Sequence, residues 1–122
     1  MENNSQTQTT FHKRLKHLLD NFVDQVYYVS KKFPKDELFG VTSQLRRAAL
    51  SVVLNYVEGY ARQGDAVLRN FLKIAYGSLK ESEYLIEFCY RQKYVGETDF
   101  KELAQKANEI GAMLYSIISK LS

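Results

Sequence analysis

The chain has 122 residues, of which 45% are hydrophobic and 25% are charged, and 17 Lys and Arg against 14 Asp and Glu give a net charge of +3. This length suits one domain with a single core. One proline and six glycines exclude collagen-like and proline-rich disordered proteins. The single cysteine, Cys89, cannot form an intrachain disulfide, so the composition does not imply an oxidising compartment.

The ends and the apolar segments give no sign of a targeting or membrane segment. Residues 1–10 are polar and lack the basic start and apolar stretch of a secretory signal. The most apolar window, residues 48–57, has about half the roughly 20 residues that a membrane span needs. We therefore expect a soluble, cytoplasmic protein without membrane contact, with residues 1–10 as a disordered polar tail and 11–122 as a single domain.

Apolar residues at helical spacing predict a first helix over residues 11–33. Its stripe consists of Phe11, Leu15, Leu18, Phe22, Val26, Val29 and Phe33. Pro34 should end this helix, because the residue before a proline is disfavoured in the α region. Residues 35–41 are expected to form a turn or a short helical piece, after which Thr42 or Ser43 would cap the next helix.

The second predicted helix, residues 42–62, is apolar around most of its circumference and should be the most buried one. Gly64 follows it at a position that suits a left-handed conformation, and Asp65 is placed to cap a third helix over residues 66–92.

Gly96 then breaks the helical spacing, and a fourth helix is predicted over residues 99–121. Asp99 with Glu102 resembles a capping box at its start. No segment alternates as a strand would, and the links are short. The fold class predicted is all-α, an antiparallel up-down-up-down four-helix bundle.

Residues suited to catalysis or to metal binding are few. His12 and His17 are five residues apart, so they do not share a helix face for a metal, and Cys89 has no Cys or His nearby. No nucleotide-binding or nucleophile motif is present. Three glutamates on the third helix favour a solvated face over acid–base chemistry: Glu81, Glu83 and Glu87. We expect no enzyme, no metal and no cofactor.

A polar row follows the most apolar helix and consists of Gln44, Arg47, Ser51, Asn55 and Glu58. It is interpreted as a solvated face, a ligand site or an interior network, and the short Ser51 and Asn55 favour the network. An antiparallel hairpin places Arg47 opposite Glu81 and Ser51 opposite the small Gly77, where two backbones can approach closely. We expect Arg47 to pair with Glu81, and loss of one partner of a buried pair costs about 3–5 kcal/mol.

Two basic patches are candidates for nucleic-acid binding. The first consists of Arg69, Lys73, Tyr76 and Lys80 on the third helix, with Arg62 just before it. Cations that flank a ring suit phosphate contacts and base stacking. The second consists of Lys13, Arg14 and Lys16, which oppose the helix dipole if they lie in a first turn. The alternative for both patches is an ordinary solvated face.

The second and third helices have more apolar surface than one bundle seam needs, which favours a homo-oligomer. The residues concerned are Val53, Tyr56, Val57, Tyr60, Phe71 and Ile74.

Two stretches, Ser43–Arg62 and Phe71–Leu85, resemble the bacterial four-helix bundle family named for 23S rRNA intervening sequences. The family pattern Q-x-x-R-A-x-x-S-x-x-x-N-x-x-E-G, then F-x-x-x-A-x-G-S-x-x-E, is matched here by Gln44, Arg47, Ala48, Ser51, Asn55, Glu58, Gly59, Phe71, Ala75, Gly77, Ser78 and Glu81. Tyr56-Val57 departs from the commoner Ile-Ala. The resemblance covers about residues 11–121.

The resemblance implies a four-helix bundle that can assemble into a ring-shaped homopentamer. Related accessory proteins of diversity-generating retroelements are similar in fold, and they bind nucleic acid and a reverse transcriptase. Two functions are therefore expected as alternatives: a non-catalytic oligomeric module that binds structured RNA or DNA, or a purely structural scaffold whose partners are proteins.

Overall fold

The computed structural model describes residues 2–121, with side chains from residue 10 onward. Four helices make up the fold: α1 (Glu2–Ser30), α2 (Ser43–Ala61), α3 (Asp65–Arg91) and α4 (Glu97–Lys120). Each lies within a few residues of the range predicted for it, except at the start of α1. No strand occurs between residues 2 and 121.

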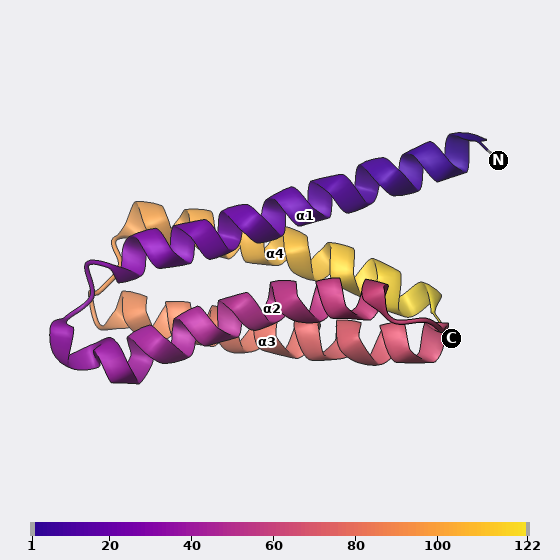
Figure 1. The fold of residues 1–122 in the computed structure, drawn as a ribbon. Helices are drawn as coiled ribbons and strands as arrows, with labels where there is room; N and C mark the ends of the chain where they lie inside the picture. The colour runs from indigo at the N-terminus through magenta and orange to yellow at the C-terminus, as the bar shows by residue number, and fades with distance from the viewer. Residues whose placement is uncertain (1, 122) are drawn as a thin grey trace.

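The four helices run alternately up and down, with both ends of the chain at the same end of the bundle (Figure 1). α1 packs against α2 and α4, and α3 packs against the same two helices, so α1 and α3 lie diagonally opposite each other. The predicted class, an all-α antiparallel four-helix bundle, is confirmed.

The core consists of side chains that recur at steps of three and four on each helix, which is the spacing that places them on one face. The largest fully buried side chains are Leu15, Leu19, Phe22, Val26, Leu45, Val52, Leu72, Leu79, Ile86, Leu103, Ile110 and Leu114. α2 was expected to be the most buried helix, and six of its 19 residues are buried, against six of 27 in α3 and five of 24 in α4. The outer side of α2 leaves Leu54 and Val57 about half exposed or more, because no fifth helix covers it.

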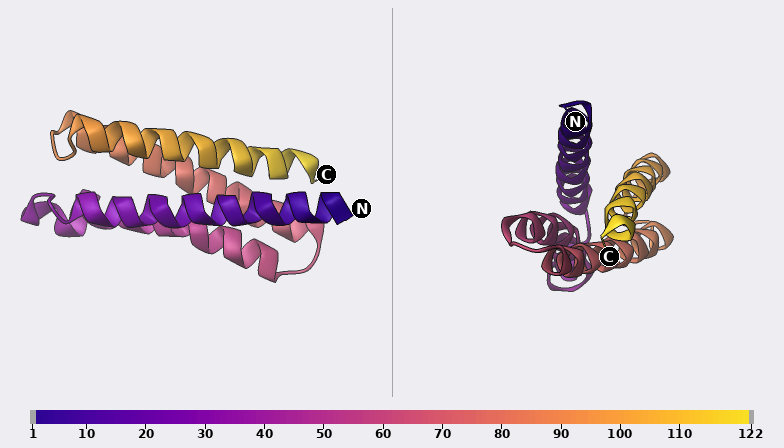
Figure 2. Two further views of the ribbon diagram at one scale, coloured as in Figure 1. Left: turned by 90° about the horizontal axis from the view of Figure 1, so that it is seen from above. Right: turned by 90° about the vertical axis from the view of Figure 1, so that its right-hand side faces the viewer.

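The start of α1 differs from the tail expected for residues 1–10. The helix begins at Glu2, and its first turns extend beyond the ends of the other helices (Figures 1 and 2). Residues 2–10 contain no proline or glycine, so nothing in the sequence stops the helix from propagating outward from its packed part. Met1 lies outside the described residues.

Two short helical turns connect α1 to α2: a 3₁₀ turn η1 (Lys35–Glu37) and a π turn η2 (Leu38–Thr42). α1 ends before Pro34, as predicted. The backbone kinks at Gly40 (φ −107°, ψ −117°) and continues into α2 without a side-chain cap. Neither of the two candidate caps therefore acts as one, because the π turn already supplies helical backbone before α2.

Glycines mark the two other connections. Gly64 has φ of +100°, which confirms a backbone conformation that favours glycine. α3 and α4 each begin earlier than predicted, so Asp65 and Asp99 lie inside their first turns rather than at caps. Asp99 instead accepts a hydrogen bond from Gln25 of α1 at 3.3 Å. Among the described residues, no helix is long and apolar enough to cross a membrane.

Candidate nucleic-acid interface

The polar row on α2 forms a small hydrogen-bonded cluster at the seam with α3. The hydroxyls of Ser51 and Ser78 lie 2.7 Å apart, and the Asn55 amide donates to the Ser51 backbone oxygen at 2.8 Å and to its hydroxyl at 3.0 Å. All three side chains are half-buried. The row thus joins the two helices through its short members, Ser51 and Asn55.

The long members of the row stay in water, and the expected Arg47–Glu81 pair is wrong. Both side chains are exposed, and no ion pair joins them in the part of the chain described. Ser51 meets Ser78 rather than Gly77, and the two charged side chains lie on the outer sides of their helices, where they keep their hydration. Gln44 is also exposed, and Glu58 pairs with Arg62 at 2.6 Å.

We therefore expect Glu81→Ala to change the free energy of unfolding by no more than about 0.5 kcal/mol, the usual range for an exposed side chain. Ser51→Ala is the matched comparison, because it removes hydrogen bonds at the seam and should cost about 1 kcal/mol. Urea denaturation of the two variants measures both changes. A loss of more than about 2 kcal/mol of unfolding free energy in Glu81→Ala would instead support the buried Arg47–Glu81 pair.

The first basic patch lies on α3 along the side that faces α4. Lys80 pairs with Glu83 at 3.3 Å, and its ammonium lies 5.2 Å from the centre of the Tyr76 ring. Arg69 and Lys73 have no acidic partner among the described residues. The Nε atom of Arg69 is buried without an acceptor there. This patch therefore offers two cations beside one ring.

Tyr115 of α4 extends this patch and was not found from the sequence. Its ring centre lies 6.4 Å from that of Tyr76, and its side chain is 62% exposed. The only sequence signal for it is a tyrosine that follows the core position Leu114 and so falls outside the apolar stripe of its helix. We name Arg69, Lys73, Tyr76 and Tyr115 the aromatic–basic face.

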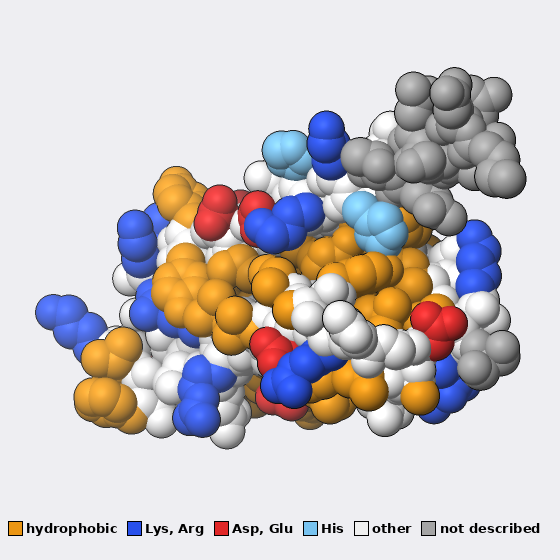
Figure 3. Space-filling model, turned by 45° about the vertical axis from the view of Figure 1, so that its right-hand side comes forward, with side chains coloured by type: hydrophobic (Ala, Val, Ile, Leu, Met, Phe, Trp, Pro, Cys, Tyr) orange, Lys and Arg blue, Asp and Glu red, His pale blue; other side chains and the backbone are white. Residues whose placement is uncertain are grey.

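Arg62 and the three cations of the second patch do not join this face. Arg62 is held by Glu58, Arg14 pairs with Glu109 at 3.3 Å, and Lys16 pairs with Asp20 at 3.0 Å. Lys13, Arg14 and Lys16 lie on α1, diagonally across the bundle from α3. They also lie beyond the first turn of a helix that begins at Glu2, so the expected conflict with its dipole does not arise. On the face drawn in Figure 3, Lys and Arg side chains are scattered among acidic and apolar groups.

An aromatic cluster joins α1 to α2 toward the end of the bundle where both chain ends lie. His12 Nδ1 lies 2.7 Å from the Tyr56 hydroxyl, and the His12 ring packs edge-on against Tyr60 at 4.9 Å. A cavity of about 230 Å³ lies beside it, lined partly by Phe11 and Ile117. Burial lowers the pKa of His12 and raises that of Tyr56.

We expect stability to fall as the pH drops below about 6.5, the ordinary pKa of histidine. Because burial lowers the pKa of His12, the unfolded chain binds a proton at this residue before the folded chain does. Thermal melts between pH 7.5 and 5.5 measure the effect, and His12→Gln should flatten it. The exposed His17 provides the control, His17→Gln, and an equal slope in all three proteins would contradict the assignment.

The remaining candidate groups offer little reactivity. Cys89 is buried, and burial raises the pKa of its thiol to about 11, so it is protonated at neutral pH. Among the described residues, no group of three or more His, Cys, Asp or Glu is placed to hold a metal ion. Glu81 is exposed, whereas Glu83 and Glu87 border a groove between α3 and α4.

The fold and the sequence of this chain are similar to those of known proteins. The chain is similar to a protein of unknown function from the S23 ribosomal protein family of Bacteroides thetaiotaomicron VPI-5482, whose crystal structure has a TM-score of 0.82 at 24% identity, over 89% of this chain and 98% of that one. That likeness shows the shared fold. A comparison with curated proteins found no match. The family model described as 23S rRNA-intervening sequence protein matches residues 16–116, which is most of the chain. The chain belongs to the family of 23S rRNA-intervening sequence proteins.

Proposed function

We propose that this protein is a non-catalytic, homo-oligomeric helical module that binds structured RNA or DNA through its aromatic–basic face. The observation that carries the proposal is that Arg69 and Lys73 have no acidic partner among the described residues. They precede Tyr76 on α3 by about two turns and one turn, and the Tyr76 ring pairs with that of Tyr115. Cations neutralise phosphates, and exposed rings stack on unpaired bases. The cytoplasm is the proposed location, which suits a chain with one free thiol.

Self-association is the second part of the proposal. Leu54 and Val57 of α2, with Val67 and Ile74 of α3, leave exposed apolar side chains on the outer side of this helix pair. Such surface on a globular protein favours an interface. A homopentamer is proposed, and only the family resemblance favours that number of copies. Because one protomer has a net charge of only +3, repetition of a weak site around a ring would add affinity through avidity.

The test measures the affinity for structured RNA and for duplex DNA over a series of salt concentrations. Affinity should fall with salt, with a slope of log affinity against log salt of about −0.9 per phosphate contact on duplex DNA and about −0.7 on single strands. The double variant Lys73→Glu, Tyr115→Ala should bind at least about tenfold more weakly, because it loses a phosphate contact and a stacking ring. Lys101→Glu makes the same charge change at another exposed site and should bind as the wild type does.

The alternative is a structural scaffold that binds only proteins, and the exposed apolar side chains of α2 and α3 favour it. Wild-type protein that binds no nucleic acid at low salt would support this alternative. Equal affinity and salt slope in the wild type and the double variant would show that the aromatic–basic face is only solvated. A protein partner, such as a reverse transcriptase, is proposed from the family resemblance under either function.

A further inference from the structure

The connection between α1 and α2 presents an apolar side chain to water on a well-held turn. Phe39 is 93% exposed and its neighbour Leu38 is 48% exposed. The turn is fixed on both sides: the Tyr94 hydroxyl donates to the Glu37 carboxylate at 3.0 Å, and Val41 is buried in the core. We name Leu38 and Phe39 the knob.

Transfer of a phenyl ring out of water lowers the free energy, so contact with an apolar surface of another molecule would stabilise the exposed knob. Glu37 also lies close against the turn, since a Cβ atom at Gly40 would lie 2.8 Å from its carboxylate oxygen. The knob is therefore held on the outside of the turn, where a surface on another molecule could cover it.

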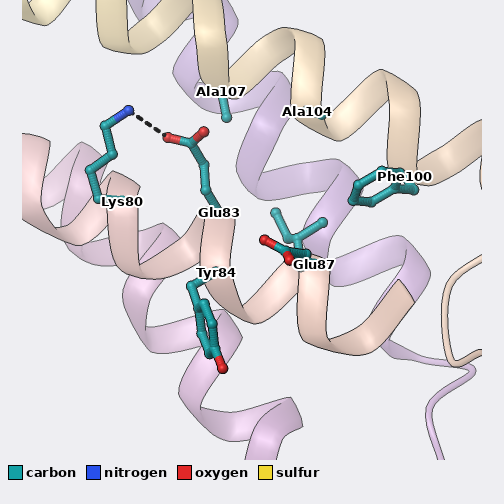
Figure 4. A pocket seen from close by; sticks show the side chains of 8 residues that line it. Lys80, Glu83, Tyr84, Glu87, Phe100, Ala104 and Ala107 are labelled. Carbon is teal, nitrogen blue, oxygen red and sulfur yellow. Dashed lines mark ion pairs between the residues drawn. The ribbon is translucent and has the colours of Figure 1, made fainter. Parts of the chain in front are cut away.

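A groove of about 340 Å³ lies between α3 and α4 (Figure 4). Its apolar lining includes Ile86, Phe100, Ala104 and Ala107, and the two alanines leave the space that larger side chains would fill. Glu83 and Glu87 of α3 border it. Glu83 is paired with Lys80, whereas Glu87 has no cationic partner among the described residues.

The size of the knob, and the charge of the residues beside it, suit the groove. A cavity of about 150 Å³ holds one benzene ring, so 340 Å³ has room for the Phe39 ring and the Leu38 side chain together. Lys35 stands four residues before Phe39 and has no acidic partner in the part of the chain described. Lys31 and Lys32 add positive charge to the same connection, and Asp36 and Glu37 offset part of it. A connection with one excess positive charge would thus meet a rim where Lys80 stands beside Glu83 and Glu87, with one excess negative charge.

We propose that the knob of one copy inserts into the α3–α4 groove of a second copy, with Lys35 placed against the second copy's Glu87. The inference rests on the self-association proposed above and names a contact that forms it. Because the knob and the groove are different surfaces, the contact is heterologous: each copy uses its knob on one neighbour and its groove on another. Repetition of such a contact closes into a ring when the rotation between copies allows it.

The test is sedimentation velocity over a range of concentrations, with thermal melts to confirm folding. Phe39→Ser removes the knob, and Ala104→Phe fills the groove at an exposed position. Each variant should self-associate at least about tenfold more weakly than the wild type. Tyr115→Ser removes an exposed ring elsewhere and should assemble as the wild type does.

Mixing the two variants gives the sharper result. The Phe39→Ser protein retains an intact groove and the Ala104→Phe protein retains an intact knob, so equal amounts should form one-to-one pairs and nothing larger. Lys35→Glu should weaken assembly, and addition of Glu87→Lys in the same chain should restore it. This charge exchange keeps the test valid if Ala104→Phe fails to fold.

The outcomes separate this contact from self-association as such. A wild-type protein that stays monomeric at every concentration overturns the proposed assembly, and this contact with it. If the Phe39→Ser and Ala104→Phe variants both assemble as strongly as the wild type, the knob-and-groove contact alone is overturned. The outer side of α2 and α3 then remains as the interface. Loss of binding to anionic lipid vesicles in Phe39→Ser, without a change in assembly, would assign the knob to a membrane surface instead.

Discussion

Replacement of Phe22 by alanine is expected to lower the free energy of unfolding by about 3–5 kcal/mol, the usual cost of truncating a buried aromatic side chain. Phe22 is fully buried and lies midway along the packed part of α1. The loss combines apolar area returned to water with the cavity left behind. α1 depends on such side chains, because its polar contacts with α4 are few: the exposed Arg14–Glu109 pair and the half-buried Gln25, which bonds to Asp99 and Lys106.

Urea denaturation measures this change as a lower midpoint with an unchanged slope. The exposed neighbour Asn21 provides the control, since Asn21→Ala should stay within about 0.5 kcal/mol of the wild type. A loss below about 1 kcal/mol for Phe22→Ala would contradict the packing of α1 described above.

The same substitution at two glycines is expected to have opposite effects. A Cβ atom at Gly59 would lie 3.0 Å from the Phe71 Cβ and 3.1 Å from the Leu68 Cδ1, so Gly59→Ala pushes α2 and α3 apart. Overpacking of this kind costs about 1–3 kcal/mol, which outweighs the gain of up to about 1 kcal/mol in helix propensity. A Cβ atom at Gly77 would meet nothing within 4 Å, and Gly77→Ala should stabilise α3 by up to about 1 kcal/mol through helix propensity alone.

Thermal and urea unfolding of the two alanine variants should therefore differ in sign. Destabilisation by Gly77→Ala in the monomer would show that the close approach predicted for Gly77 from the sequence is real. Unchanged or higher stability in Gly59→Ala would show that α2 and α3 have room for an additional methyl group beside Phe71.

The helices were predictable because each one repeats apolar residues at a spacing that only one secondary structure satisfies. The stripe from Phe11 to Phe33 and the breaks at Pro34 and Gly64 are local signals, so one sequence contains them in full. Helix starts were less predictable. A polar residue near a start, such as Thr42 or Asp99, has the chemistry of a cap. Neither acts as one, because α2 continues directly from a π turn and α4 begins two residues before Asp99.

The candidate site was harder to predict because long charged side chains choose their partners in three dimensions. An antiparallel register brought the α2 row to α3, and Ser51 does meet Ser78, one residue from the glycine expected there. This offset of one residue changes little for Ser51, which still bonds to α3. Arg47 and Glu81, in contrast, are both exposed to water. Tyr115 was missed for a related reason: its partner, Tyr76, lies on another helix, and no pattern within α4 reveals it.

The order of the helices also has a consequence for how the chain folds. Three of the four packed pairs join helices that are consecutive in sequence, and only α1 with α4 links the two ends of the chain. Such a topology has low contact order, which is typical of fast folding. The α1–α4 seam must close the longest loop, so it carries the greatest entropic cost. Local opening of the native protein should begin with α1, whose outer turns already stand clear of its neighbours.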